Sequence, residues 1–213
     1  MTGRFVSLEG GEGAGKSSAL ETCRTHLEAH GFDVVLTREP GGSPLAERIR
    51  NLMLDPAHAD MHAPTELLLA FAARAQHVRD TIRPALARGA WVLSDRFTDS
   101  SYAYQGGGRG LPMTTIAMLE DFAVDDTRPG LTLLLDLPVA QGLDRMKGRG
   151  RIDRIEAEST EFFERVRTTF RKRATADAAR FRVIDASQPI DKVAADLKAA
   201  LDAFIARPEG AST

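Results

Sequence analysis

The apolar residues of the chain alternate between short runs and longer stretches with helical spacing. The short runs are apolar without in-and-out alternation, as expected for strands that are buried on both faces of a parallel sheet. They predict strands at 5–8, 34–37, 91–94, 131–135 and 181–184. The longer stretches predict helices at 16–30, 44–53, 66–88, 114–124, 139–147, 160–178 and 192–206. The order of these elements predicts an α/β fold with three layers, α/β/α, around a five-stranded parallel sheet.

The length and the composition fit one well-packed domain. The chain has 213 residues, of which 43% are hydrophobic, and no internal repeat or interdomain linker interrupts the pattern. We therefore expect a single domain over residues 1–206, followed by a flexible tail at 207–213.

The charge balance and the cysteine count restrict the location and the partners. The formal net charge is −2, which gives no support to binding of a nucleic acid polymer. No apolar run reaches the roughly 20 residues of a membrane helix, and the N-terminus has no charged-then-apolar signal region. The single cysteine, Cys23, excludes an internal disulfide and suits a reducing compartment. We expect a cytoplasmic protein that has neither a membrane nor a nucleic acid polymer as a partner.

A glycine-rich motif follows the first predicted strand and opens the first predicted helix. Residues 10–17 read Gly-Gly-Glu-Gly-Ala-Gly-Lys-Ser and match G-x-x-x-x-G-K-[ST]. The glycines let backbone N–H groups surround phosphate oxygens, and the helix N-terminus adds a positive dipole end. Lys16 supplies a positive charge for the β and γ phosphates, and the Ser17 hydroxyl is placed to hold Mg²⁺. The motif predicts a P-loop that binds ATP and Mg²⁺ through Gly10, Gly11, Glu12, Gly13, Ala14, Gly15, Lys16, Ser17 and Ser18.

The P-loop alone does not define the reaction. A GTP-binding switch needs an Asn-Lys-x-Asp segment, but the only asparagine, Asn51, lies in Asn-Leu-Met. A remodelling ATPase is expected to end a second strand in an acidic pair, whereas the strand at 131–135 is followed by Asp-Leu-Pro. A kinase for a small acceptor fits the short chain and its arginines better.

Three arginine sites supply the charge that such a kinase needs. Phosphoryl transfer to an anionic acceptor requires positive charge between two anions that repel each other. Arg38 ends the second predicted strand, and Arg96 follows Asp95 at the end of the third. The run at 147–154, Lys-Gly-Arg-Gly-Arg-Ile-Asp-Arg, predicts a lid over about 147–157 that closes on the phosphates, with an exposed basic loop as the alternative.

Together these motifs resemble bacterial thymidylate kinase, and the resemblance covers nearly the whole chain. The motifs are at 5–18, 37–43, 95–97 with 104–110, and 151–156, in the order and spacing of that family. The resemblance implies a P-loop nucleoside monophosphate kinase that transfers the γ-phosphate of ATP to dTMP. The products are dTDP and ADP, in the dTTP synthesis pathway, and the family usually forms a homodimer.

The resemblance also implies roles for residues near the phosphates. Glu12 would contact the 3′-hydroxyl of the deoxyribose. Arg38 and Arg96 would hold the acceptor phosphate, and Arg96 would also reach the transferred group. Asp95 and Glu9 would lie near Mg²⁺ together with the P-loop serine.

A second set of implied roles concerns the base and the sugar. Arg74 would hydrogen-bond thymine through its guanidinium group. Phe71 is the candidate to stack on thymine, although some family members place the stacking aromatic where this chain has Ala70. The alternative for Phe71 is packing in the core. The remaining base and sugar contacts would come from Ser101, Tyr104 and Gln105.

Residues 11–14 of the P-loop contain no basic side chain, so the compensating charge is expected from the lid. Arg149 is the first candidate, followed by Arg151 and Arg154, of which Arg154 could instead pair with Asp153 or Glu156. The predicted catalytic residues are Lys16, Arg96 and Arg149.

Two other functions stay open at this point. One is a kinase of the same fold that acts on another nucleoside monophosphate or on a deoxynucleoside. The other is a regulatory protein that hydrolyses ATP slowly without an acceptor, although Arg38 and the loop expected at 104–110 would then have no obvious use. The histidines give no metal-binding spacing with carboxylates, and we expect His26 and His30, one helical turn apart, to be surface residues.

Overall fold

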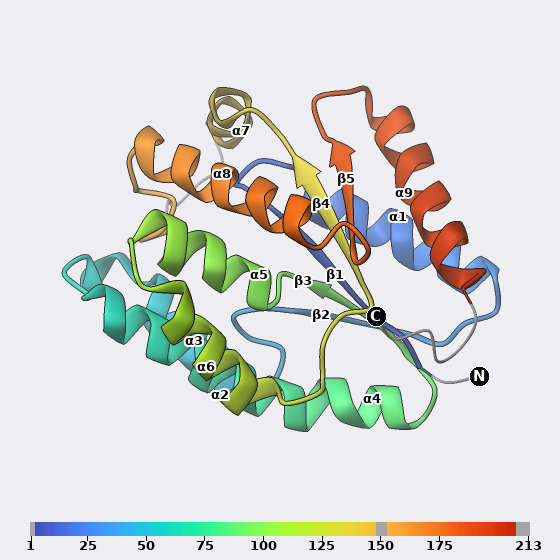
Figure 1. Ribbon diagram of the computed structural model, residues 1–213, viewed down its shortest axis with the longest axis horizontal. Helices are drawn as coiled ribbons and strands as arrows, with labels where there is room; N and C mark the ends of the chain where they lie inside the picture. The colour runs from blue at the N-terminus through green and yellow to red at the C-terminus, as the bar shows by residue number, and fades with distance from the viewer. Residues whose placement is uncertain (1–2, 148–152, 208–213) are drawn as a thin grey trace.

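The computed structural model describes residues 3–147 and 153–207 (Figure 1). Within these residues, five parallel strands form one sheet in the order β2-β3-β1-β4-β5. The strands are β1 (Phe5–Gly10), β2 (Val34–Arg38), β3 (Trp91–Asp95), β4 (Leu131–Asp136) and β5 (Phe181–Asp185). The five predicted strands are confirmed, and each extends one or two residues beyond its predicted end.

The register of the sheet aligns the carboxyl ends of the central strands. Leu8 of β1 lies opposite Asp95 of β3, and Arg38 of β2 lies opposite the same residue. On the other side of β1, Gly10 lies opposite Leu135 of β4. The P-loop, which follows Gly10, therefore begins at the edge where ligands bind in open parallel sheets.

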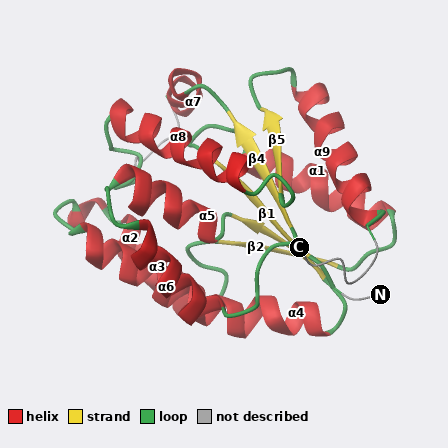
Figure 2. Ribbon diagram, in the orientation of Figure 1, coloured by secondary structure: helices red, strands yellow, loops and turns green. Residues whose placement is uncertain are grey.

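Helices cover both faces of the sheet, so the predicted three layers are confirmed (Figures 1 and 2). Helices α1 and α9 pack on one face through Leu27, Leu197 and Leu201. Helices α3, α6 and α8 contribute apolar residues to the clusters on the other face. The bounds are α1 (Lys16–Ala29), α2 (Pro44–Leu54), η1 (Pro56–His58), α3 (Ala63–His77), η2 (Val78–Ile82), α4 (Arg83–Ala87), α5 (Thr98–Ser101), η3 (Tyr102–Gly108), α6 (Met113–Val124), α7 (Val139–Met146), α8 (Thr160–Ala176) and α9 (Ile190–Ile205). No described helix is long and apolar enough to cross a membrane.

The helix predicted at 66–88 is divided by a wider, π-helical segment, η2, between α3 and α4. Pro84 lies directly after this segment. A proline has no N–H to donate, and its ring clashes with the carbonyl four residues earlier in a regular α-helix. The wider turn before Pro84 relieves both conflicts while the chain continues in one direction.

The glycine-rich segment at 104–110, expected to be a loop, is mostly helical. It lies in η3, a π-helical segment that continues directly from α5. Two of its glycines, Gly107 and Gly108, are explained by close packing against α8. A Cβ on Gly107 would lie 2.0 Å from Thr169 Oγ1, and one on Gly108 would lie 2.4 Å from Phe162 Cε2.

We expect Gly107→Ala to lower the free energy of unfolding by about 1–3 kcal/mol, because the added methyl group forces η3 and α8 apart. Urea denaturation would measure the loss. Gly11→Ala is the matched control, since a Cβ there meets no atom within 4 Å. Equal stability of the two variants would contradict the close packing of η3 on α8.

Candidate active site

The P-loop turns tightly between β1 and α1, and its glycines are required by the backbone. Gly13 and Gly15 have φ angles of 69° and 87°, in the left-handed region that favours glycine. A Cβ on Gly13 would also lie 2.2 Å from the carbonyl oxygen of Gly142 in α7. Lys16 Nζ donates to the carbonyl oxygens of Gly10 and Gly11 at 3.2 and 3.0 Å. Burial lowers the pKa of Lys16, and the charge of Arg96 lowers it further.

A cavity of about 290 Å³ opens beside the P-loop at the carboxyl edge of the sheet. Its wall includes most of the predicted site residues: Glu12, Gly13, Ala14, Gly15, Lys16, Ser17, Ser18, Arg74, Asp95, Arg96, Ser101, Tyr104 and Gln105. Further lining residues come from the turn after β2, from α2 and from residues 153–156. The P-loop and α3 therefore line the same cavity.

Arg96 lies between the two ends of this cavity in a strained backbone conformation. Its φ angle is 72°, which is uncommon for a residue with a side chain. Its backbone N–H donates to the Leu8 carbonyl at 2.9 Å, and its carbonyl accepts from Ser94 Oγ at 2.7 Å. The guanidinium donates to the Gly10 carbonyl at 2.9 Å and to Glu12 Oε1 at 2.6 Å. Hydrogen bonds from both strands therefore fix the side chain above the P-loop.

Glu12 forms a compact ionic group with Arg96 and Tyr104. Its Oε1 also accepts from the Tyr104 hydroxyl at 2.7 Å, and the Arg96 guanidinium lies over the Tyr104 ring. Burial acts to raise the pKa of Glu12, but the positive charges of Arg96 and Lys16 outweigh it and lower the pKa to about 2. Glu12 is therefore an anion and a hydrogen-bond acceptor at neutral pH.

Glu9, predicted to lie near Mg²⁺, lies outside the cavity wall. It is fully buried, and its carboxyl group accepts from the Phe97 N–H at 2.7 Å and from Ser100 Oγ at 2.6 Å. Burial raises the pKa of Glu9 to about 8, and the negative charge of Asp99 acts in the same direction. Glu9 thus holds the chain directly after Arg96, and its place near Mg²⁺ stays a prediction.

The far end of the cavity contains a buried arginine, Arg74 of α3. Its guanidinium donates to Glu39 Oε2 at 2.7 Å, to Ser101 Oγ at 3.0 Å and to the Phe97 carbonyl at 3.1 Å. Glu39, which the sequence reasoning missed, also lines the cavity and accepts from His77 Nδ1 at 2.9 Å. The guanidinium is therefore held rigidly in one orientation.

Phe71 does not line the cavity, contrary to its predicted place against a base. It is 3% exposed and packs in the apolar cluster between α3 and α6. The Arg74 guanidinium lies over its ring, 4.6 Å from the centroid. The α3 side chains in the cavity wall are those of Ala70 and Arg74. Phe71 thus packs with its ring against the guanidinium of Arg74.

Arg38 lies outside the cavity wall, beside a second arginine that lines it. The Arg38 side chain is 55% exposed and pairs with Glu47 Oε2 at 3.0 Å. Arg50 of α2 lines the cavity, and its Nη1 donates to the Pro40 carbonyl at 2.8 Å. The position of Arg38 at a strand end predicts its edge of the sheet but not the direction of its side chain.

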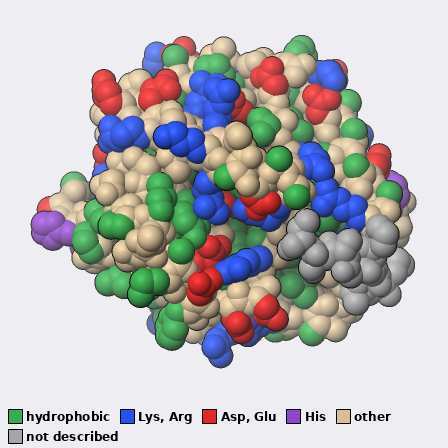
Figure 3. Space-filling model, viewed as in Figure 1, with side chains coloured by type: hydrophobic (Ala, Val, Ile, Leu, Met, Phe, Trp, Pro, Cys, Tyr) green, Lys and Arg blue, Asp and Glu red, His purple; other side chains and the backbone are tan. Residues whose placement is uncertain are grey.

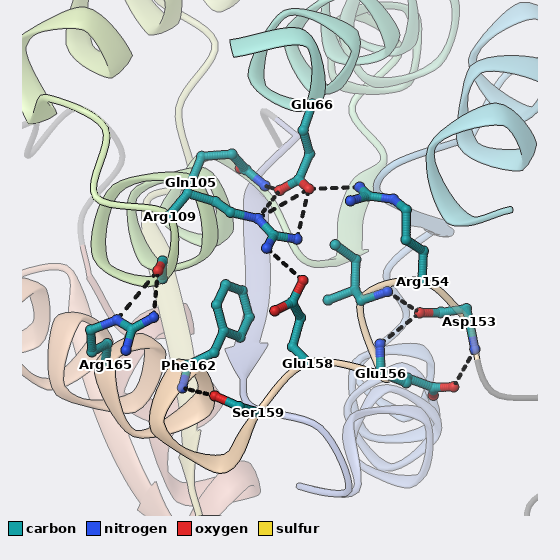
Figure 4. A network of polar contacts seen from close by, with 12 residues as sticks. Glu66, Gln105, Arg109, Asp153, Arg154, Glu156, Glu158, Ser159, Phe162 and Arg165 are labelled. Carbon is teal, nitrogen blue, oxygen red and sulfur yellow. Dashed lines mark hydrogen bonds and ion pairs between the residues drawn. The ribbon is translucent and has the colours of Figure 1, made fainter. Parts of the chain in front are cut away.

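A buried carboxylate, Glu66, joins three elements around the cavity (Figure 4). Glu66 is 0% exposed and accepts from Gln105 at 2.8 Å, from Arg109 at 3.0 Å and from Arg154 at 2.6 Å. Arg154 also donates to the Met53 carbonyl at 2.8 Å. Arg154 thus pairs with Glu66 rather than with Asp153 or Glu156, and it anchors the segment after residue 152. Arg149 and Arg151 lie outside the described residues.

A second groove, of about 210 Å³, lies on the other side of the P-loop. Ala14, Gly15 and Ser18 separate it from the main cavity, which they also line. Its remaining wall comes from α1, β4, α7, the turn after β5 and α9, and includes Arg145 and Gln188. The P-loop therefore lines both the main cavity and this groove.

We expect Glu66→Ala to lower the free energy of unfolding by about 3 kcal/mol, because Arg109 and Arg154 lose their buried partner. Urea denaturation would measure it. Glu158→Ala is the control, since Glu158 is partly exposed and pairs with Arg109 alone, and its loss is expected to stay below about 1 kcal/mol. Similar losses in both variants would argue against Glu66 as the central residue.

Comparisons with known proteins agree with this geometry. The family model described as thymidylate kinase matches residues 8–197. A thymidylate kinase of Pseudomonas savastanoi pv. phaseolicola is 58% identical over 205 residues, 96% of each chain. One of Pseudomonas fluorescens is 62% identical over 193 residues, 91% of this chain and 92% of the relative. The crystal structure of thymidylate kinase from Ehrlichia chaffeensis is 31% identical, with a TM-score of 0.77 over 95% of this chain and 99% of the other. The chain belongs to the thymidylate kinase family of enzymes.

Proposed function

We propose that the protein transfers the γ-phosphate of ATP to dTMP and forms dTDP and ADP. The observation that carries this proposal is the cavity, which joins the P-loop at one end to the buried Arg74 at the other, with Arg96 between them. Family membership supports the reaction and the pair of substrates. The role in nucleotide biosynthesis, as a supplier of the dTTP pathway, follows from the product.

The P-loop binds the phosphates of ATP, and the second groove takes its purine. Backbone N–H groups and the N-terminus of α1 face the phosphates. Among the residues that the structure describes, Lys16 hydrogen-bonds only loop carbonyls, so it can turn to the β and γ phosphates without breaking an ion pair there. Gln188 and Arg145 offer polar groups at the edge of the purine groove.

The acceptor lies across Arg96 from ATP. Arg96 holds its phosphate and the transferred group, and Arg38 and Arg50 supply further positive charge on the acceptor side. Glu12 accepts from the 3′-hydroxyl of the sugar, and Tyr104, fixed by Glu12, crowds a ribose 2′-hydroxyl. At the base, Arg74 donates to thymine. Ser101 and Gln105 complete the wall around it.

The donor set at the P-loop fits Mg²⁺. Asp95 Oδ1 is buried and has no hydrogen-bond partner among the described residues, and Asp95 lines the cavity together with Ser17. A carboxylate and a hydroxyl are the hard oxygen ligands that Mg²⁺ prefers. When bound, the ion would neutralise charge on the phosphates. Asp95 and Ser17 would hold it, directly or through water, with Glu9 behind them next to the Arg96 turn.

An apolar surface on α3 and α6 supports the proposal of a homodimer. Leu68, Met118 and Phe122 are 58, 73 and 85% exposed, and hydrophobic side chains gather over this region (Figure 3). Exposed apolar patches of this kind mark interaction sites. The cytoplasm is the proposed location, in keeping with the single buried Cys23.

The lid over 147–157 and the catalytic role of Arg149 stay predictions, because residues 148–152 lie outside the described residues. So do the limits of the domain at 1–206 and the tail at 207–213. The described part of the lid segment, which begins at Asp153, contributes Asp153, Ile155 and Glu156 to the cavity wall.

We expect ADP release from ATP and Mg²⁺ to be fast with dTMP and slow with dUMP, dCMP, dGMP, AMP or no acceptor. A coupled assay for ADP would measure each rate, and omission of Mg²⁺ should abolish the dTMP rate. Preference for another monophosphate would reject the base contacts of Arg74 while keeping the reaction. Release of ADP that does not depend on an acceptor would reject the kinase assignment itself.

A further inference from the structure

Three potential metal ligands meet on the surface where α1 and α9 pack together. His26 and His30 lie at the end of α1, and Asp202 lies in the last turn of α9. One ligand atom from each, two imidazole nitrogens and a carboxylate oxygen, lie within 4.8 Å of one another. The group is remote in sequence from the cavity, whose walls contain none of these residues.

The spacing of these atoms is close to that of a metal site. His26 Nε2 lies 2.6 Å from Asp202 Oδ1, and His30 Nε2 lies 3.8 Å from the same oxygen. In a tetrahedral site with bonds of about 2.0–2.1 Å, neighbouring ligand atoms are roughly 3.3 Å apart. To bind a metal ion, the His26–Asp202 distance must therefore lengthen and the His30–Asp202 distance must shorten, each by less than about 1 Å. Rotation of the partly exposed His30 and Asp202 side chains can supply these shifts.

The hydrogen bonding of His30 leaves one nitrogen directed at this point. His30 Nδ1 lies 2.8 Å from the His26 carbonyl oxygen. A carbonyl oxygen only accepts, so Nδ1 must carry the proton and donate. In the neutral ring Nε2 then has a lone pair near the Asp202 carboxylate. Two electron-rich groups placed in this way call for a cation between them, and a backbone bond to the far nitrogen is the usual arrangement in a metal-binding histidine.

The ends of both helices add to the preference for a cation. Helix α1 ends at Ala29 and α9 ends at Ile205, within one turn of the three ligands. The last carbonyl groups of a helix carry partial negative charge. An ion pair between His26 and Asp202 would satisfy those two residues, while His30 Nε2, at 3.8 Å from the same oxygen, would stay beyond hydrogen-bond distance.

We propose that His26, His30 and Asp202 bind a late first-row divalent cation and that Zn²⁺ occupies the site when it is supplied. Imidazole and carboxylate ligands suit Zn²⁺, Cu²⁺ and Ni²⁺ better than Mg²⁺. Three protein ligands leave a fourth position for water. The ion would join α9 to α1. It would therefore stabilise the packing of these two helices and would take no part in phosphoryl transfer.

The test is calorimetric titration of the full chain with ZnCl₂ after treatment with EDTA, without nucleotide. We expect one Zn²⁺ per chain, with a thermal unfolding midpoint that rises on addition of Zn²⁺ and falls back with EDTA. His30→Ala and the isosteric Asp202→Asn should each weaken binding at least about tenfold and abolish the rise in the midpoint. Both variants should match the unsubstituted protein in EDTA, which shows that they fold.

His58→Ala is the matched control, since it removes a histidine of η1 outside the group and should leave Zn²⁺ binding unchanged. The proposal is overturned if no saturable binding is found. It is also overturned if His30→Ala and Asp202→Asn bind Zn²⁺ as the unsubstituted protein does, because the ion then binds elsewhere. Either result leaves the kinase assignment untouched, since that assignment does not depend on these residues.

Discussion

The left-handed backbone of Arg96 is the constraint on which the arrangement of the cavity depends. A φ angle of 72° is unfavourable for arginine and persists only where the surroundings fix it. In this protein β1 and Ser94 bind its backbone, and the buried Glu9 binds the next residue through its N–H. The result is a guanidinium that faces the P-loop and Glu12. The strained backbone thus fixes a positive charge between the proposed donor and acceptor.

The sequence could predict the fold because each signal for it is local. The five strands are short apolar runs, and the P-loop needs its glycines and lysine in one continuous segment. The family resemblance pointed to Arg96 and Arg74, and both line the cavity. The prediction of a loop failed for the π-helical η3, because its glycines allow close packing: Gly106 against α6, and Gly107 and Gly108 against α8.

The remaining site residues depend on contacts between distant parts of the chain. Glu9 and Arg38 both lie near the carboxyl ends of their strands. The Glu9 side chain is buried against Phe97 and Ser100, whereas the Arg38 side chain is exposed and pairs with Glu47. Glu66 meets its partner Arg154 across 88 positions, and Asp202 meets His26 across 176. No spacing along the sequence reports such pairs. The one sign in the sequence was a lone glutamate beside the apolar run at 67–71, and the structure shows that it is buried.

Glu9 acts on catalysis through the backbone turn of Arg96, and a double-mutant cycle tests this role most directly. The measurement is kcat/KM for dTMP in Glu9→Ala, Arg96→Lys and the double variant. If Glu9 serves only to hold the Arg96 turn, the double variant should be no slower than the worse single variant, with a coupling energy of about 1 kcal/mol or more. If the two losses multiply, Glu9 contributes independently of Arg96, which would contradict its role in holding the Arg96 turn.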